Sequence, residues 1–257
     1  MSANNSGHVV DTIIECLSIV GTAARLGIDK AEFCMETFVW MVERVWLFVR
    51  SRPRRRYILV SGAAAGADHV AVFLFNNDIQ LLQQDRWFIG LELCMPAPWL
   101  SHQLKWDVTV HKDGGTAHYY HELFSKTCGD TSKYCMRSQY LFTLLQKHNQ
   151  LPTPLLQVIV NYCRFPPVSS LQEIEIAKQN GAIFHTQYNG FEERNQGIAK
   201  LSDRMIAFTY SQTDEPPLRR SGTRSTWNHH AKRCGADRRH HFSLPLGLTN
   251  PRTLPPC

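Results

Sequence analysis

The sequence lacks the features of several specialised protein classes. Its eight cysteines form no CxxC pair and no dense framework of the kind that small secreted proteins use, which favours a reducing compartment. The amino-terminal residues show neither the basic stretch nor the apolar run of a secretory signal. The most apolar window, 38–49, contains charged residues and falls short of the roughly 20 residues that cross a bilayer. We therefore expect a cytoplasmic protein without a membrane partner.

Charge of either sign is also scarce. Charged residues make up 19% of the 257 residues and hydrophobic residues 43%, values typical of a chain that folds around a core. This length suits one large α/β domain or two small ones. We favour a single domain over 1–235, with a family-variable insertion at about 100–187 and a poorly ordered tail at 236–257.

The charge that is present is unevenly placed. The formal net charge is +6, and the basic residues are concentrated in the runs 50–56 and 219–239. Such runs suggest anionic partners, nucleic acid among them. Solvated loops are the alternative, favoured for the first run because Pro53 marks a connection between a helix and a strand.

Short apolar runs alternate with longer stretches of helical spacing. The runs predict buried strands, and the 3.6-residue period predicts helices. This alternation indicates an α/β fold with a Rossmann-like open sheet, mainly parallel, and helices on both faces. The expected strands are 13–20, 57–60, 87–94 and 204–210, and the expected helices are 29–49, 68–75, 170–180, one that ends at 201 and one that opens at 221–223.

The stretch between 100 and 187 is harder to assign. It offers a Gly114-Gly115 turn, a helix over 138–147 and a strand over 155–162. At the other end of the chain, 241–248 could supply a last edge strand.

The glycine-rich turn Ser61-Gly62-Ala63-Ala64-Ala65-Gly66-Ala67-Asp68 follows an expected strand and opens an expected helix. Glycine lets the backbone approach a ligand closely, and the amino-terminal N–H groups of a helix favour phosphate. Small residues at this place also serve ordinary packing, so the turn alone leaves both interpretations open. Two more small-residue turns, 21–25 and 221–223, favour ligand binding, because the carboxyl ends of parallel strands meet at one edge.

The ordered series of segments is more specific than any single turn. It resembles the nucleotide-binding superfamily often called SLOG, which joins DNA-processing protein A (Smf) with the Lonely Guy phosphoribohydrolases. The resemblance covers roughly 14–100 and 185–235. The matching segments are Val20-Gly21-Thr22-Ala23-Ala24-Arg25, 60–68, Pro98-Trp99, Arg194-Asn195-Gln196-Gly197-Ile198, 203–208 and 221–227.

The resemblance implies a phosphate site built from backbone N–H groups of the turn 62–66 and of Gly222 and Thr223, with Arg194 and Asn195 facing the ligand. Asp68 either caps a helix or orients the turn, and we favour the cap. The full set of candidate ligand-binding residues is Gly21, Thr22, Arg25, Ser61, Gly62, Ala63, Gly66, Asp68, Arg194, Asn195, Gly222 and Thr223.

Two departures separate this chain from the enzymatic branch. Thr226 stands where the hydrolase motif carries a glutamate, and Ala63 replaces the second glycine of the turn. An oxocarbenium-like transition state needs nearby negative charge or a general base. We see no replacement near the motif, although Asp214 and Glu215 lie in the preceding loop.

The expected function is therefore binding of a phosphate-bearing nucleotide or nucleotide-derived ligand, as in a sensor. A nucleoside monophosphate phosphoribohydrolase or nucleosidase is the alternative. Single-stranded DNA binding ranks last, because Trp99, Trp106 and Trp227 could stack on bases but more often form core in an α/β domain. We expect no cofactor, and the superfamily leaves a homodimer open.

The remaining histidines and cysteines carry weaker signals. A zinc site would need a spacing that the carboxyl-terminal group does not match, so we expect no metal. A place on the polar surface accounts for the histidines of the insertion, and structural thiols account for Cys128 and Cys135. The carboxyl-terminal group is His229, His230, Cys234, His240 and His241, and the histidines of the insertion are His111, His118 and His121.

Overall fold

Six strands form one open sheet in the order β6-β3-β2-β1-β7-β8, and every pairing in it is parallel. The computed structural model describes residues 12–23, 35–81, 87–129, 169–210, 221–235 and 237–244. The strands are β1 (Ile13–Gly21), β2 (Arg55–Ser61), β3 (Phe88–Cys94), β6 (Ile183–His185), β7 (Arg204–Thr209) and β8 (Arg239–Ser243). The predicted α/β class with a mainly parallel, Rossmann-like sheet is confirmed.

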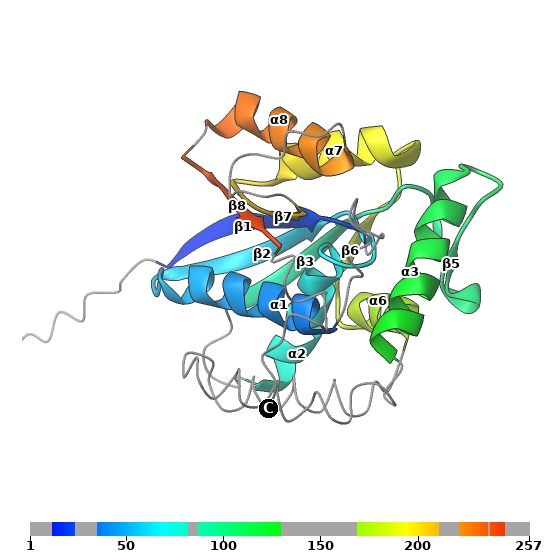
Figure 1. The fold of residues 1–257 in the computed structure, drawn as a ribbon, viewed down its shortest axis with the longest axis horizontal. Coiled ribbons are helices and arrows are strands. Elements are labelled where there is room, and N and C mark those ends of the chain that lie inside the picture. The colour runs from blue at the N-terminus through cyan, green and yellow to red at the C-terminus, as the bar shows by residue number, and fades with distance from the viewer. Residues whose placement is uncertain are drawn as a thin grey trace, which may run out of the picture.

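Helices cover both faces of this sheet, as predicted (Figure 1). One face carries α1 (Met35–Arg50), α2 (His69–Leu81) and α6 (Ser170–Gln179), while α7 (Gly190–Leu201) and α8 (Gly222–Cys234) lie on the other. Beside α6 stands α3 (Asp113–Gly129), next to the small antiparallel pair β4 (Trp99–Leu100) and β5 (Lys105–Trp106), which a 3-10 turn at Ser101–Gln103 connects. Among the described helices, none is both long enough and apolar enough to cross a membrane.

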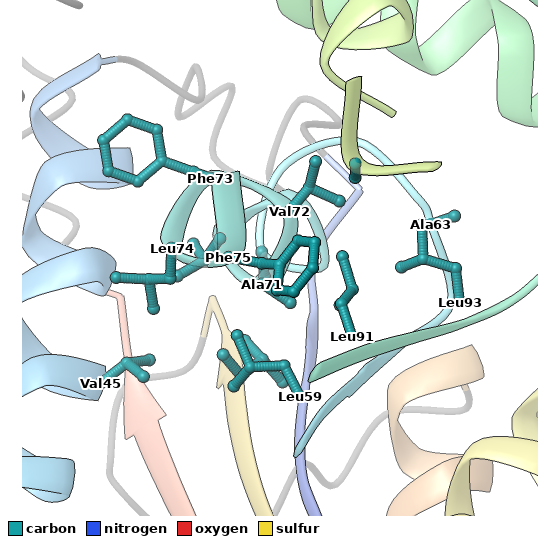
Figure 2. Packing of buried hydrophobic residues seen from close by; sticks show 14 of the residues in the cluster. Val45, Leu59, Ala63, Ala71, Val72, Phe73, Leu74, Phe75, Leu91 and Leu93 are labelled. Atoms are coloured by element: carbon teal, nitrogen blue, oxygen red, sulfur yellow. The ribbon is translucent and has the colours of Figure 1, made fainter. Parts of the chain in front are cut away.

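Between Val70 and Phe75, helix α2 is apolar around its whole circumference, and the fold buries this part on every side. Its residues from Val70 to Phe75 are all at most 4% exposed. Figure 2 shows the residues from Ala71 to Phe75 among Val45 of α1, Leu59 of β2 and Leu91 of β3. A helix without a polar face needs cover on the side away from the sheet. That cover comes from α3 and α6, so the segment predicted as an insertion completes the core.

The core residues that this segment contributes are large and well packed. Phe124 of α3 and Ile174 of α6 are at most 1% exposed and belong to the same cluster as α2. The Phe38 ring of α1 meets Phe73 and Phe124 edge to face, with 5.6 Å between centroids in both pairs. Helices α1, α2 and α3 are therefore joined by two aromatic ring pairs that share Phe38. Each pair contributes about 0.5–1.5 kcal/mol beyond burial.

Two predictions about local structure were wrong. The predicted Gly114-Gly115 turn lies inside α3, where a Cβ on Gly114 would come within 2.8 Å of the Cβ of Trp106, so the glycine permits close packing of a helix. The tail expected to be poorly ordered from 236 contributes β8, which pairs with β7, as the edge-strand alternative foresaw in part. The helix predicted at 138–147, the strand at 155–162 and residues 29–34 lie outside the described residues.

The sheet reverses its winding between β1 and β7. From β1 the chain passes through α1 to β2 on one side, whereas from β7 it passes through α8 to β8 on the other. Neighbouring strands whose connections run to opposite faces leave the ends between them uncovered by a crossover, and ligands of open α/β sheets bind there. The carboxyl ends of β1 and β7 are thus the place to look for a site.

Candidate functional site

The three small-residue turns meet at the carboxyl edge of the sheet. The N–H of Thr22, after β1, donates to the Phe208 carbonyl of β7 over 2.9 Å, and the N–H of Ala67 donates to the Thr22 carbonyl over 3.0 Å. A Cβ on Gly21 would lie 2.2 Å from the Phe208 carbonyl oxygen. Only glycine allows this approach, so the sequence at the end of β1 sets how closely the first two turns come together.

Asp68 ties the first turn to the second. Its carboxylate accepts the N–H of Gly21 over 3.2 Å and also the backbone N–H groups of Gly62 and Ala64. The N–H groups of Val70 and Ala71, which a cap would satisfy, donate instead to the carbonyls of Ala67 and Asp68. The expectation that Asp68 caps the helix was therefore wrong, and it orients the turn.

The carboxylate of Asp68 is a charge inside the protein. The residue is 3% exposed, and burial raises the pKa of Asp68 to about 6, while Arg194 and the three backbone N–H groups oppose the rise. At neutral pH the group is ionised, and the glycine turn already holds an anion that belongs to the chain. A phosphate cannot occupy the N–H groups that face Asp68.

Arg194 is the counter-charge, and it braces the turn from α7. Its guanidinium donates to the Gly62 carbonyl over 3.1 Å and to the Asn195 side-chain oxygen over 3.0 Å. A Cβ on Gly62 would stand 2.7 Å from Asp68 Oδ2 and 2.8 Å from Arg194 Cζ. Burial lowers the pKa of Arg194, and the carboxylate of Asp68 opposes this shift. Gly62 is thus required because two side chains of opposite charge lie against it.

Asn195 carries the connection on to the amino terminus of α8. A Cβ on Gly222 would meet the Asn195 amide nitrogen at 3.2 Å. Ser221 caps α8 by accepting the N–H of Arg224 over 3.2 Å. Thr223 is buried, at 9% exposed, whereas Gly222 is the only exposed residue among the predicted ones that the structure describes.

Ser61 and Ala63 are the remaining residues of the second turn, 61–68, that the sequence singled out. Ser61 is fully buried, and its hydroxyl donates to the Asp68 carbonyl over 2.9 Å. Ala63 adopts φ 51°, a left-handed conformation that costs a non-glycine residue roughly 1–2 kcal/mol. Gly66 also has a positive φ, 77°. The replacement of a glycine by Ala63 therefore falls where the backbone still takes a glycine conformation.

His121 holds the strained Ala63 in place. The imidazole Nε2 lies 3.0 Å from the Ala63 carbonyl and Nδ1 lies 2.9 Å from the Ser170 hydroxyl of α6. His121 is fully buried, and burial together with His69 lowers its pKa to about 3, so the ring is neutral. The prediction that His121 lies on the polar surface was wrong, and α3 reaches the site through this residue.

Glu192 is a residue at this edge that the sequence did not reveal. It lies in the first turn of α7, and the Ser225 hydroxyl of α8 donates to its carboxylate at 2.9 and 3.0 Å. The His229 ring lies 3.4 Å away, and these hydrogen bonds hold the pKa of Glu192 below its usual value. Ser225 precedes Thr226, so a carboxylate does stand beside the motif that lacks one. The sequence could not show that Glu192 lies beside this motif, because the contact depends on how α7 and α8 pack together.

The histidines that were considered as zinc ligands each have different neighbours. His229 faces Glu192, His240 packs on Phe48 at 4.9 Å between centroids, and His241 lies 2.6 Å from the Thr209 hydroxyl. Within the described ranges, no set of three or more His, Cys, Asp or Glu side chains is arranged to hold a metal.

The tryptophans belong to the core, as their more frequent role suggests. Trp99, Trp106 and Trp227 are 8%, 0% and 6% exposed. Trp99 also donates its ring N–H to Glu175 over 2.8 Å. Base stacking on these rings is therefore excluded in this conformation. Arg25, Asp214 and Glu215 lie outside the described residues.

Comparison with known proteins gives one relative and no family. The chain is 27% identical over 215 residues, 82% of its length, to an uncharacterized protein of Acanthamoeba polyphaga mimivirus, of which the match covers 88%. No protein-family model matches the chain. No solved structure matches it either. The fold and the geometry of its carboxyl edge therefore carry the functional argument.

We predict that Arg194→Met destabilises the protein in a pH-dependent way. At pH 7 the variant leaves the Asp68 carboxylate buried without its cation, and the free energy of unfolding should fall by about 3–5 kcal/mol. Because the folded-state pKa of Asp68 is raised to about 6, its contribution to stability is present below about pH 4 and is lost as the pH rises through 6. Without Arg194 the pKa rises further, so the loss should be smaller at pH 5 than at pH 8.

Denaturant unfolding at the two pH values measures this difference. Lys200→Met removes an exposed cation from the same helix and should change stability by no more than about 0.5 kcal/mol at either pH. Equal losses for Arg194→Met at pH 5 and pH 8 would show that Asp68 is not its partner.

Proposed function

We propose that the carboxyl edge of the sheet binds a phosphate-bearing nucleotide or nucleotide-derived ligand, with the phosphate at the amino terminus of α8. The observation that carries the proposal is the position of Gly222 and Thr223. They are the first residues of a 13-residue helix, and they lie next to the point where the sheet reverses its winding. Helix amino termini attract anions through unpaired N–H groups and the helix dipole.

The buried carboxylate of Asp68 favours α8 over the glycine turn as the phosphate contact. Asp68 faces the N–H groups of Gly62 and Ala64, so a second anion beside them would meet a buried negative charge. The charge of Asp68 fixes the neighbouring Arg194 and Asn195 in position before any ligand binds. Asn195, which approaches Gly222, is the side chain that this frame directs to α8. A preformed frame lowers the entropy lost on binding.

The expected behaviour is binding without turnover. We predict that a thermal-shift screen of nucleoside monophosphates, ADP-ribose, NAD and cyclic nucleotides finds at least one compound that raises Tm. The shift should disappear in Gly222→Trp, whose side chain would cover the first N–H groups of α8 without a positive φ to strain it. Lys232→Trp places the same side chain at the exposed, opposite end of α8 and should keep the shift.

Two results of the same screen would contradict phosphate binding at α8. If no compound stabilises the protein, or if Gly222→Trp responds as strongly as Lys232→Trp, the phosphate is not bound at α8.

Hydrolysis of an N-glycosidic bond is the second candidate, and Glu192 is the observation that favours it. Its carboxylate, in the first turn of α7, is oriented by Ser225 in the first turn of α8 and by His229 further along that helix. The lowered pKa keeps it ionised, and a carboxylate of this kind can stabilise a positively charged sugar or activate a water. In this reaction water would add at C1′, the C1′–N bond would break with its electron pair going to the base, and the base would take up the proton.

We predict that any release of base from a nucleoside monophosphate depends on Glu192. Glu192→Gln keeps the hydrogen-bonding shape but loses the negative charge, and it should lower the rate at least ~100-fold, the range of general acid–base effects. Product release is followed by mass spectrometry, and ligand binding by Tm. Glu193→Gln is the matched control, because it neutralises the neighbouring exposed carboxylate of the same helix turn. Turnover that survives Glu192→Gln would exclude this residue from the reaction.

A further inference from the structure

Basic residues that are far apart in the sequence gather at the opposite, amino edge of the sheet. Strands β2, β7 and β8 begin with Arg55, Arg204 and Arg239. Because all strands of the sheet are parallel, these three residues start at one edge, shown on the left of Figure 1. Helices that lead back to this edge end in cations as well. The exposed basic residues there are Arg50, Arg54, Lys200, Lys232, Arg233 and Arg238.

Electrostatic contacts show that these segments share one surface. The buried Glu15 of β1 is ion-paired with both Arg55 and Arg204. Arg52 and Arg204 add to the burial that lowers the pKa of His240. The run 50–56 and the described basic residues between 232 and 239 are therefore at the same edge of the fold, with β1 and β7 between the strands β2 and β8 that they precede. We call this surface the arginine edge.

Helix dipoles account for only part of the arginine edge. Cations in the last turn of a helix interact favourably with its carboxyl end, and this suits Arg50 of α1 and Arg233 of α8. Strands have small net dipoles, so the arginines before and at the starts of β2 and β8 gain nothing comparable. Arg54 and Arg238, both exposed, are such residues.

Some of these guanidinium groups are oriented in advance. Arg52 Cζ lies 4.1 Å from the centroid of the Phe48 ring, and Arg239 Cζ lies 4.6 Å from that of Trp227. Stacking on an aromatic ring restricts an arginine side chain while its charge remains. Phosphate is the anion that such planar, multiply donating groups match best. Lysine, which is the commoner cation of surfaces that serve only solubility, is the minority here.

We propose that the arginine edge binds the phosphate backbone of nucleic acid without reading its bases. A polyanion fits a surface spread over three chain segments, whereas a single phosphate would use one or two of its cations. Trp99, Trp106 and Trp227 are buried and offer the bases no stacking platform, so the proposed contact is electrostatic. This site is separate from the carboxyl edge, and neither proposal depends on the other.

Fluorescence anisotropy with a labelled single strand of about 30 nucleotides and a duplex of about 30 base pairs tests the proposal at several salt concentrations, since phosphate binding is salt-dependent. The double variant Arg54→Glu/Arg238→Glu reverses exposed charges on two segments and should weaken binding at least ~10-fold at about 100 mM salt. Its log–log salt slope should be less steep by about two, because each of the two arginines no longer neutralises a phosphate. The matched double variant Lys105→Glu/Lys112→Glu changes the net charge equally in the β5–α3 segment and should weaken binding less than about threefold.

Binding of either oligonucleotide with this pattern supports the proposal. Absence of binding by the unaltered protein, or equal losses in the two double variants, would overturn it. So would binding to phosphatidylserine vesicles in place of both oligonucleotides. Matching Tm values for the variants and the unaltered protein exclude unfolding as the cause, and a nucleotide-induced rise in Tm that persists in Arg54→Glu/Arg238→Glu keeps the two sites distinct.

Discussion

The electrostatic attraction between the buried charges of Asp68 and Arg194 is the interaction on which the carboxyl edge depends. Asp68 collects the N–H groups that end β1 and β2, and Arg194 joins the same turn to α7. Through Asn195 the connection reaches α8. A buried pair of this kind does not guarantee stability by itself, since desolvation offsets much of the attraction. Its value here is positional, because it sets four chain segments in one arrangement.

The same constraint explains why so many residues near the turn are small. Gly62 is enclosed by the two charged side chains, and Gly21 by the Phe208 carbonyl. Neither glycine is needed to admit a ligand, although that is the role that the sequence pattern suggests for both. The glycine turn thus serves close packing and binds the Asp68 carboxylate, and the accessible N–H donor is that of Gly222.

The sequence predicted the α/β class, the strands β1, β2, β3 and β7 and the helices α1, α2, α6, α7 and α8, because apolar periodicity and small-residue turns are local signals. It missed β6 and α3. It could not show that Asp68 faces the turn and not its own helix, since both arrangements have the same sequence. The sequence also predicted that no carboxylate lies near Thr226, whereas Glu192 of α7 accepts a hydrogen bond from the neighbouring Ser225. His121 was hidden for a similar reason, because its partners Ala63 and Ser170 are distant along the chain.

Locating a bound phosphate analogue is the most direct test of the central claim that α8 supplies the anion contact. Crystals soaked in tungstate would give an anomalous signal at the bound anion. We predict a peak within hydrogen-bond distance of the backbone nitrogens of Gly222 and Thr223, with Asp68 still bound to the Gly21 N–H and Arg194 to the Gly62 carbonyl. A peak inside the turn at Gly62 and Ala64, with Asp68 displaced, would contradict the account.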